Sequence, residues 1–148
     1  MGHNINAFIG KNNIIEKLSD DWIKARTIPL KQGFSMVYLT DELLDDMTEL
    51  SDLENEWDCP EMMFFTKTVF QIMQRYSKNT ILAYIETDYF GGTGTQAGVL
   101  FENGKIVIEP TKEEKIINKI LHRLGVYKEK DKDEFDSLSL RNYRRMYD

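Results

Sequence analysis

Carboxylates are the chemistry-bearing side chains that this sequence concentrates most strongly. Between positions 41 and 61 there are ten acidic residues and no Lys or Arg. A run of one sign attracts positively charged partners, whereas ordinary solvated surfaces mix both signs. We interpret this segment as a docking surface for a basic protein, with a plain solvated face as the alternative. The predicted partner-binding residues are Asp41, Glu42, Asp45, Asp46, Glu49, Asp52, Glu54, Glu56, Trp57 and Asp58.

The same carboxylates also have to be considered as metal ligands. Oxygen ligands suit Mg²⁺ and Ca²⁺, and Asp-Glu-x-x-Asp-Asp loosely resembles aspartate-rich magnesium sites. An EF-hand loop, however, needs glycine at its sixth position and glutamate at its twelfth. Counted from Asp41, those positions hold Asp46 and Asp52. The sequence therefore predicts no metal site and no cofactor.

A second candidate site surrounds a glycine-rich loop at residues 91–95. Glu86 and Asp88 are two residues apart on a predicted strand, so they share a face and could act as an acid and a base. A phosphate cradle would need a helix after the glycines, but a strand is predicted there. The glycines either form a hairpin connection or a recognition tip for a small hydrolase or ligand-binding domain. The residues of this alternative site are Glu86, Asp88, Tyr89, Thr93 and Gln96.

Cysteine and histidine give no catalytic signature. Cys59 is the single cysteine, so it forms no internal disulfide, and no spacing pairs it with His3 or His122 as nucleophile and base. No catalytic residue is predicted, and the patterns favour a non-enzymatic protein over an enzyme. The start lacks the charged and apolar regions of a signal peptide, and no apolar run approaches the length of a membrane span. We therefore expect a cytoplasmic protein in a reducing compartment.

Periodicity predicts the elements that position these side chains. Apolar residues at three- and four-residue steps predict helices over 13–25, 40–52, 60–76 and 111–124, the last with a Thr111/Glu114 capping box and a Gly125 cap. Alternation predicts strands over 4–9, 33–40, 81–87, 96–102 and 105–109, with an Asn103-Gly104 hairpin turn between the last two. The predicted fold class is α+β, with about four helices on an antiparallel or mixed sheet that ends in a three-strand meander.

Length and charge limit the possible functions. The chain has 148 residues, 19 basic and 25 acidic, and a formal net charge of −6. This fits a single domain over 1–148, with 128–148 as a charged C-terminal arm that docks on it. The net charge disfavours nucleic acid and anionic membranes. Arg141, Arg144 and Arg145 are expected to pair with the acidic segment of the same chain or of a twofold mate.

Three segments carry a resemblance to other proteins. The run AYIETDYFGGTGTQA at 83–97, the start Met-Gly-His-Asn and the ending DEFDSLSLRNYR at 133–144 resemble a group of small uncharacterised bacterial proteins. The group has no established activity, so the resemblance implies no site residue and no cofactor. It implies a bacterial, cytoplasmic, single-domain protein. In general character, rather than in motif, the chain is also similar to immunity proteins that neutralise bacterial toxins.

Three hypotheses follow from these patterns. The leading one is a non-enzymatic binding protein, of the immunity type, whose acidic surface covers a basic target such as a nuclease toxin. The alternative is a small hydrolase or ligand-binding domain at the glycine-rich loop. The third is a homodimer in which the arginine-rich end of one copy meets the acidic segment of the other.

Overall fold

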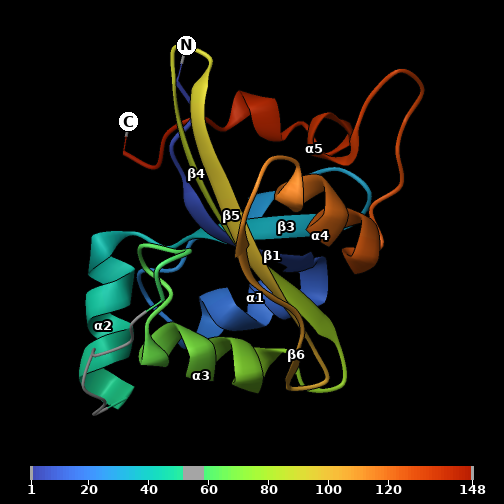
Figure 1. The fold of residues 1–148 in the computed structure, drawn as a ribbon. Coiled ribbons are helices and arrows are strands. Elements are labelled where there is room, and N and C mark those ends of the chain that lie inside the picture. The colour runs from blue at the N-terminus through green and yellow to red at the C-terminus, as the bar shows by residue number, and fades with distance from the viewer. Residues whose placement is uncertain (1, 52–58, 148) are drawn as a thin grey trace.

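One six-stranded antiparallel sheet, in the order β2-β3-β1-β4-β5-β6, forms the centre of the molecule (Figure 1). The structure, a computed structural model, describes residues 2–51 and 59–147. The α+β class and the β4–β6 meander are confirmed, whereas the two-residue strand β2 was not predicted. The strands are β1 (Asn6–Lys11), β2 (Ile28–Pro29), β3 (Phe34–Tyr38), β4 (Ile81–Phe90), β5 (Thr93–Glu102) and β6 (Lys105–Lys112). The helices are α1 (Asn12–Asp21), α2 (Asp41–Ser51), α3 (Lys67–Tyr76), α4 (Ile116–Leu124), α5 (Glu134–Ser137) and the 3₁₀ turn η1 (Leu140–Asn142).

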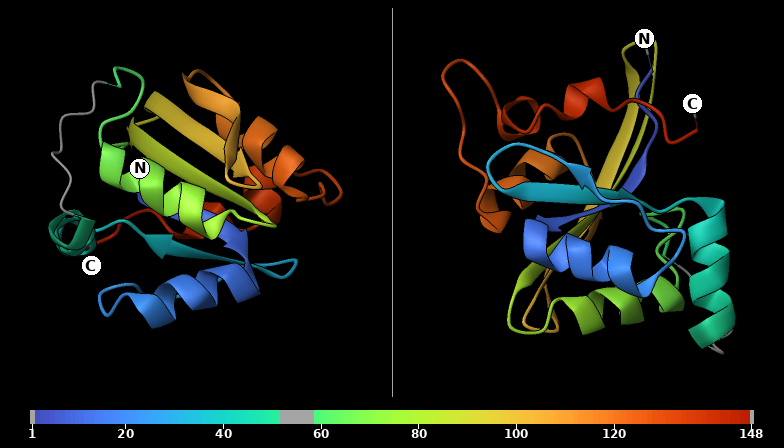
Figure 2. Two further views of the ribbon diagram at one scale, coloured as in Figure 1. Left: turned by 90° about the horizontal axis from the view of Figure 1, so that it is seen from below. Right: turned by 180° about the vertical axis from the view of Figure 1, so that it is seen from behind.

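Helices cover both faces of this sheet. Figure 2 shows α1, α2 and α3 together on one side, with α4 and the C-terminal arm on the other. The central strand β1 is consequently buried on both faces: Phe8 packs with α1–α3, and Ala7 and Ile9 pack with α4. Burial of apolar surface on both sides supplies most of the stabilisation that a sheet of this kind needs.

The β4–β5 hairpin is longer and tighter than predicted. Phe90 pairs with Thr93, and the two residues between them, Gly91 and Gly92, have φ angles of 60° and 87°. Positive φ at both central positions is the geometry of a two-residue hairpin turn, which glycine adopts at little cost. The expected loop at 91–95 is therefore a turn of two residues, and the flanking strands run into the region predicted as loop. The Asn103-Gly104 turn is confirmed, because Glu102 pairs with Lys105.

Helix α2 begins where the sequence predicted. The hydroxyl of Thr40 accepts a hydrogen bond from the backbone N–H of Leu43 at 3.2 Å, which is the expected N-cap geometry. Leu43 and Met47 are buried and hold the helix against the core beside α3. Helix α1 is shorter than predicted, since it ends at Asp21 and Trp22 is already extended.

The starts of the two other long helices were predicted wrongly. Helix α3 begins at Lys67 rather than at 60, with Thr66 as its N-cap. Helix α4 begins at Ile116, and the predicted capping box is absent because Thr111 belongs to β6 and its hydroxyl donates to the carbonyl of Glu109. The end of α4 is as predicted, with Gly125 in the left-handed conformation.

The C-terminal arm docks on the domain, as expected. Leu138 and Leu140 are completely buried in the core on the α4 side of the sheet. Asn4 and Arg145 form an isolated parallel bridge, so the beginning and the end of the chain lie side by side. Both ends therefore lie at the same end of the molecule, near the β4–β5 turn (Figures 1 and 2).

Candidate functional site

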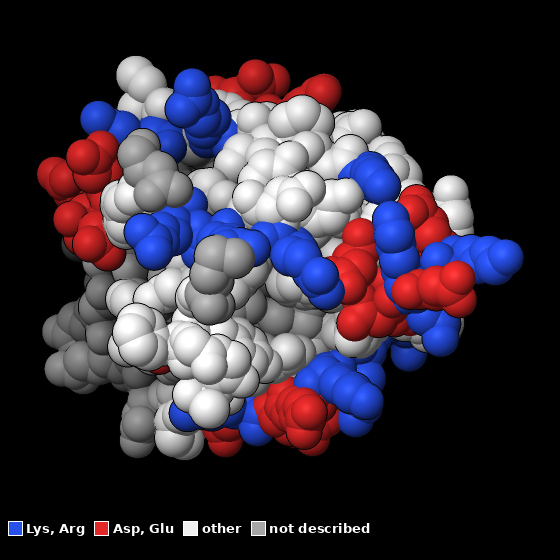
Figure 3. All heavy atoms as spheres, turned by 90° about the horizontal axis from the view of Figure 1, so that it is seen from above, with Lys and Arg blue, Asp and Glu red and all other residues white. Residues whose placement is uncertain are grey.

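Helix α2 presents a row of carboxylates to solvent. Asp41, Asp45 and Glu49 follow one another at four-residue spacing and are all exposed, on the side away from buried Met47. Figure 3 shows acidic side chains gathered over α2, at the left edge of that view. Like charges at this spacing cost a helix about 0.2 to 0.5 kcal/mol per pair. Only the carboxylates of the first turn, such as Asp41, recover part of this cost from the helix dipole.

Few counter-charges approach this row. Glu42 forms an exposed ion pair with Lys24 at 3.5 Å. The other α2 carboxylates make no ion pair with any Lys, Arg or His in the described parts of the chain. The expectation that the C-terminal arginines pair with the acidic segment is corrected for Arg141, whose guanidinium lies 2.9 Å from Asp136 of α5. The negative charge of α2 therefore remains largely available to a partner.

The structure describes only part of the remaining predicted surface. Asp52, Glu54, Glu56, Trp57 and Asp58 lie outside the described residues. Glu61 is described and exposed. Leu50 continues the apolar period of Leu43 and Met47, which predicts burial, but its side chain is 76% exposed. Leu50 instead lines a groove together with Met47, on the side of α2 away from the row Asp41, Asp45 and Glu49.

Glu86, the first residue of the alternative site, holds two elements together. Its Oε1 accepts from the backbone N–H of Met63 at 2.7 Å, and its Oε2 accepts from Phe64 N–H and from Tyr84 Oη–H, both at 2.8 Å. These bonds fold residues 61–66 as a loop, which is why α3 starts later than predicted. Burial, with the neighbouring Glu86, raises the pKa of Tyr84 well above its usual value. The buried carboxylate is thus fully engaged in structure.

The remaining residues of the alternative site do not converge on Glu86. Along β4 and β5, Glu86 and Asp88 face the α3 side of the sheet, whereas Tyr89 and Gln96 face the α4 side. Asp88 is exposed, and it lines a surface hollow of about 370 Å³ beside the C-terminal arm. Thr93 is exposed at the turn, where its hydroxyl donates to the carbonyl of Phe90. The sheet therefore divides the set that the sequence had grouped together.

Gln96 has a structural role that spacing could not show. Its side-chain carbonyl accepts from the backbone N–H of Ile117 at 2.8 Å, in the first turn of α4, and its amide donates to Tyr89 Oη at 2.9 Å. A side chain from β5 thus replaces the predicted local cap of α4. Helices leave their first N–H groups without partners inside the helix, so this bond satisfies one of them.

His3 connects the start of the chain to β4 and to the C-terminal arm. Its Nε2 lies 3.0 Å from the carbonyl of Leu140 and its Nδ1 lies 2.8 Å from Thr87 Oγ1, which also accepts from Ile5 N–H. A carbonyl can only accept, so Nε2 carries the proton and Nδ1 can accept from Thr87 in the neutral ring. Burial lowers the pKa of His3. Its place in the sequence gave no signal of this role.

The pocket next to His3, of about 500 Å³, is bordered by all three segments that carry the sequence resemblance. Many of its polar side chains already bond to each other or to backbone, among them Gln96 and Asn118, whose amide reaches Asp133 at 3.2 Å. Arg141, at its rim, is paired with Asp136. These residues therefore serve mainly to link β4, α4 and the C-terminal arm.

Metal and cysteine chemistry find little support. Within the described residues, no group of three His, Cys, Asp or Glu side chains is placed to hold a metal ion. Burial raises the pKa of the Cys59 thiol, and the nearby Glu61 carboxylate adds to the effect. A raised pKa keeps the sulfur protonated and less nucleophilic at neutral pH.

Two further results bear on the class of the protein. No helix in the described ranges combines the length and apolar character that crossing a bilayer requires. No protein family model, curated protein or solved structure matches the chain.

Proposed function

We propose that the protein is a non-enzymatic binding protein that presents the acidic face of α2 to a basic protein partner. The observation that carries the proposal is the exposed row Asp41, Asp45 and Glu49, which lacks ion pairs within the described structure. Like charges at this spacing repel one another and destabilise the helix. Binding of a basic partner would offset this repulsion with attraction between opposite charges.

A nuclease toxin is the partner class with the required chemistry. Nucleases are positively charged where they hold phosphate, so an acidic helix can cover that groove and exclude the substrate. Long-range attraction between the charges would speed the encounter. Under this proposal the protein is an immunity-type inhibitor that acts in the bacterial cytoplasm.

The alternative of a hydrolase or ligand-binding site is less well supported. Glu86 and Gln96 are held by hydrogen bonds within the protein, and the carboxylates of this set lie across the sheet from Tyr89 and Gln96. A general acid or base must be able to approach a bound substrate. The structural roles of these side chains favour the binding proposal over a reaction at this position.

The experiment compares two matched pairs of substitutions. Asp41→Asn/Asp45→Asn removes two charges at four-residue spacing from α2, and Glu16→Gln/Asp20→Asn removes two exposed charges at the same spacing from α1. The probe is the protein encoded by the adjacent gene, tested for nuclease activity and for affinity by calorimetry. We expect the α2 pair to weaken binding and inhibition by about tenfold or more, and the α1 pair to change neither.

Two results would contradict the proposal. Equal binding by both variants would show that the α2 row is not the interface. Absence of binding to the adjacent gene product and to a set of basic nuclease domains would remove the proposed partner class.

A further inference from the structure

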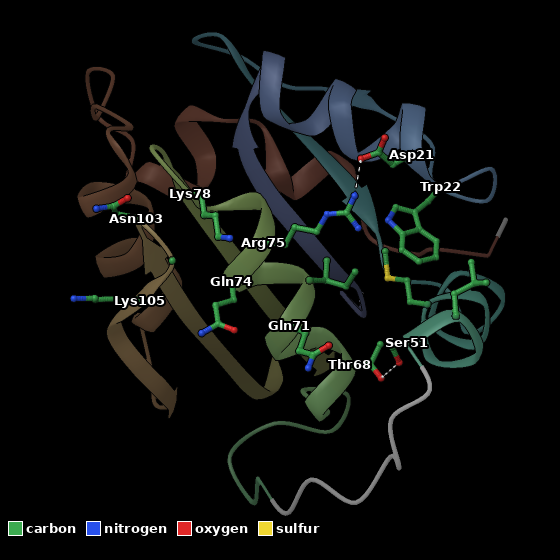
Figure 4. Close-up of a pocket in the computed structure, with 14 residues that line it drawn as sticks. Asp21, Trp22, Ser51, Thr68, Gln71, Gln74, Arg75, Lys78, Asn103 and Lys105 are labelled. Atoms are coloured by element: carbon green, nitrogen blue, oxygen red, sulfur yellow. Dashed lines mark hydrogen bonds and ion pairs between the residues drawn. The ribbon is translucent and has the colours of Figure 1, made fainter.

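A large groove lies along the outer face of α3, between the end of α2 and the β5–β6 turn (Figure 4). Its volume of about 960 Å³ is near the upper end of the range of about 300 to 1,000 Å³ that is usual for ligand sites. The described lining includes three cations, Arg75, Lys78 and Lys105, and one carboxylate, Asp21. The groove is therefore a locally basic site on a chain whose formal net charge is −6.

The end of the groove beside α2 is apolar. Trp22, Met47, Leu50 and Ile72 line it. Met47 and Ile72 are buried and belong to the core, whereas Leu50 is exposed. Trp22 Nε1 donates to Tyr76 Oη at 3.1 Å, so the indole is fixed in place. This end can accept an apolar side chain of a partner as an anchor.

Two amide side chains lie along α3 within the groove. Gln71 and Gln74 are exposed and three residues apart, and neither side chain makes a hydrogen bond with the described residues. A side-chain amide both donates and accepts, so it complements the N–H and carbonyl groups of a peptide backbone. Sites for small molecules are lined mainly by hydrophobic side chains, so this mixed lining favours a peptide.

The basic end is built on two connections that are bonded to each other. Gly104 N–H, in the β5–β6 turn, donates to Ser77 Oγ at 3.1 Å, and Asn79 N–H donates to Asn103 Oδ1 at 3.2 Å. Lys78 lies between these two bonded residues of the α3–β4 connection. Its stem passes the turn, because a β-carbon added at Gly104 would lie 3.8 Å from Lys78 Cγ. The position of Lys78 is therefore set by the fold.

The lysines of this end are not neutralised by the surrounding structure. Lys78 and Lys105 are exposed, and neither makes an ion pair with the described residues. Figure 4 shows Lys78 over α3 and Lys105 extending outward from the turn. Glu102 pairs with Lys105 across the hairpin, but its carboxylate lies 3.8 Å from Arg123 instead.

Asp21, the carboxylate of the lining, is already engaged. Tyr76 Oη donates to its Oδ2 at 2.6 Å, and Arg75 Nη2 lies 3.8 Å from the same oxygen. Burial and the bond to Asp21 raise the pKa of Tyr76 to about 12, so its hydroxyl keeps the proton that it donates. Asp21 therefore offsets the charge of Arg75 and leaves that of the two lysines to a partner.

We propose that the groove binds an acidic peptide segment of a partner protein. The segment lies along α3, with an apolar side chain beside Leu50 and carboxylates over Lys78 and Lys105. The occupant is inferred from charge complementarity, because the lysines lack counter-charges while the other end is apolar. A partner of this charge binds away from the row Asp41, Asp45 and Glu49, so the inference goes beyond the proposed function and does not depend on it.

Nucleic acid, the other common polyanion, fits the groove less well. Single strands bind where aromatic side chains stack with successive bases. Trp22 is the one aromatic residue in the described lining, and its indole is held by Tyr76. The exposed carboxylates of the neighbouring α2 would also repel a chain of phosphates.

Selection of peptides tests the chemistry of the occupant. The probe is a phage library of random peptides of about nine residues, selected in parallel on the wild type and on Lys78→Glu/Lys105→Glu. We expect the wild type to enrich acidic sequences that contain an apolar residue, and the variant not to enrich them. The most enriched peptide is then synthesised with a fluorescent label, and its Kd is measured by fluorescence polarisation at low and high salt.

Matched variants locate the bound peptide. Lys78→Glu/Lys105→Glu should weaken binding by about tenfold or more, whereas Lys11→Glu/Lys17→Glu, at exposed lysines outside the groove, should change the Kd by less than about twofold.

Leu50→Ser tests the apolar anchor. It should weaken binding by about tenfold, whereas Met63→Ser should have little effect, because Met63 is as exposed as Leu50 but does not line the groove. Circular dichroism establishes that each variant is folded.

The proposal is overturned if no sequence is enriched, or if the enriched sequences are not acidic. It is also overturned if the groove variants bind the peptide as tightly as their controls. Tighter binding of a labelled RNA of about ten nucleotides, lost in Lys78→Glu/Lys105→Glu, would assign the groove to nucleic acid instead. Asp41→Asn/Asp45→Asn should keep peptide binding, so failure of the groove and failure of the proposed function are distinguishable.

Discussion

The backbone N–H of Asp41 donates a hydrogen bond of 2.9 Å to the hydroxyl of Tyr147. Asp41 is the first residue of the acidic helix, and Tyr147 lies at the end of the C-terminal arm. The arm thus reaches α2 through a tyrosine hydroxyl that satisfies a first-turn N–H group. It leaves the carboxylate of Asp41 exposed, so the position of α2 is fixed without loss of its surface charge.

Substitution of Glu86 should affect stability rather than activity. Glu86→Gln keeps the size of the side chain but places an amide N–H₂ where a carboxylate oxygen accepts from backbone or from Tyr84. We expect the free energy of unfolding to fall by about 1 to 3 kcal/mol, the cost of an unsatisfied buried group. Urea denaturation measures this change. The exposed Asp88→Asn should shift the midpoint little, and a shift as large as that of Glu86→Gln would contradict this assignment.

Gln96 and Thr111 distinguish the observed cap of α4 from the one that local sequence predicts. Gln96→Ala removes both the acceptor for Ile117 N–H and the donor to Tyr89, and should cost about 1 to 2 kcal/mol of stability. Gln96→Glu keeps the acceptor and should recover most of this loss. Thr111→Ala should have a small effect, because its hydroxyl only bonds the carbonyl of Glu109. Thermal unfolding measures both losses of stability. A larger loss for Thr111→Ala than for Gln96→Ala would contradict the assignment of the cap to Gln96.

Helix α3 was predicted correctly only in part. Helical periodicity from Met62 to Tyr76 predicted one helix, and the part from Lys67 onward is correct. The earlier part fails because Glu86, more than twenty residues later, accepts the N–H groups of Met63 and Phe64. A bond between residues so distant in sequence leaves no periodic signal, and tertiary contacts override local pattern.

The candidate site was predictable to a similar extent. The Thr40 cap and the apolar period of α2 were enough to place Asp41, Asp45 and Glu49 on one exposed row. Exposure of Leu50 was not predictable, because it depends on which elements pack beside the end of α2. The end of α1, α3 and the β5–β6 turn line a groove of about 960 Å³ beside the end of α2. Only the tertiary structure reveals this arrangement.

His3 should make stability depend on pH. Its folded-state pKa lies below the ordinary value of 6.5, so the unfolded chain binds the proton more readily than the folded one. Stability is then fully present above about pH 6.5 and is lost as pH falls from there through the lower folded pKa. Urea unfolding at a series of pH values measures this loss.

The matched variants for this measurement are His3→Gln and His122→Gln. We expect His3→Gln to reduce the loss of stability between about pH 7 and pH 5, although it is less stable at neutral pH. His122→Gln retains His3 and replaces the other histidine, whose Nδ1 lies 3.4 Å from Glu134 Oε2, so it measures how much of the dependence arises outside His3. If the stability of His3→Gln depends on pH as strongly as that of the wild type, other groups cause the dependence.

The exposed carboxylate row of α2 is proposed to attract a basic partner. The most direct test is the association rate constant with the adjacent gene product, measured by stopped flow at about 0.05 M and 0.5 M salt, for the wild type and Asp41→Asn/Asp45→Asn. We predict that the wild-type rate falls steeply with salt, and that the variant is slower at low salt with a weaker salt dependence. Equal rates and equal salt dependence in the two proteins would show that the row takes no part in the encounter.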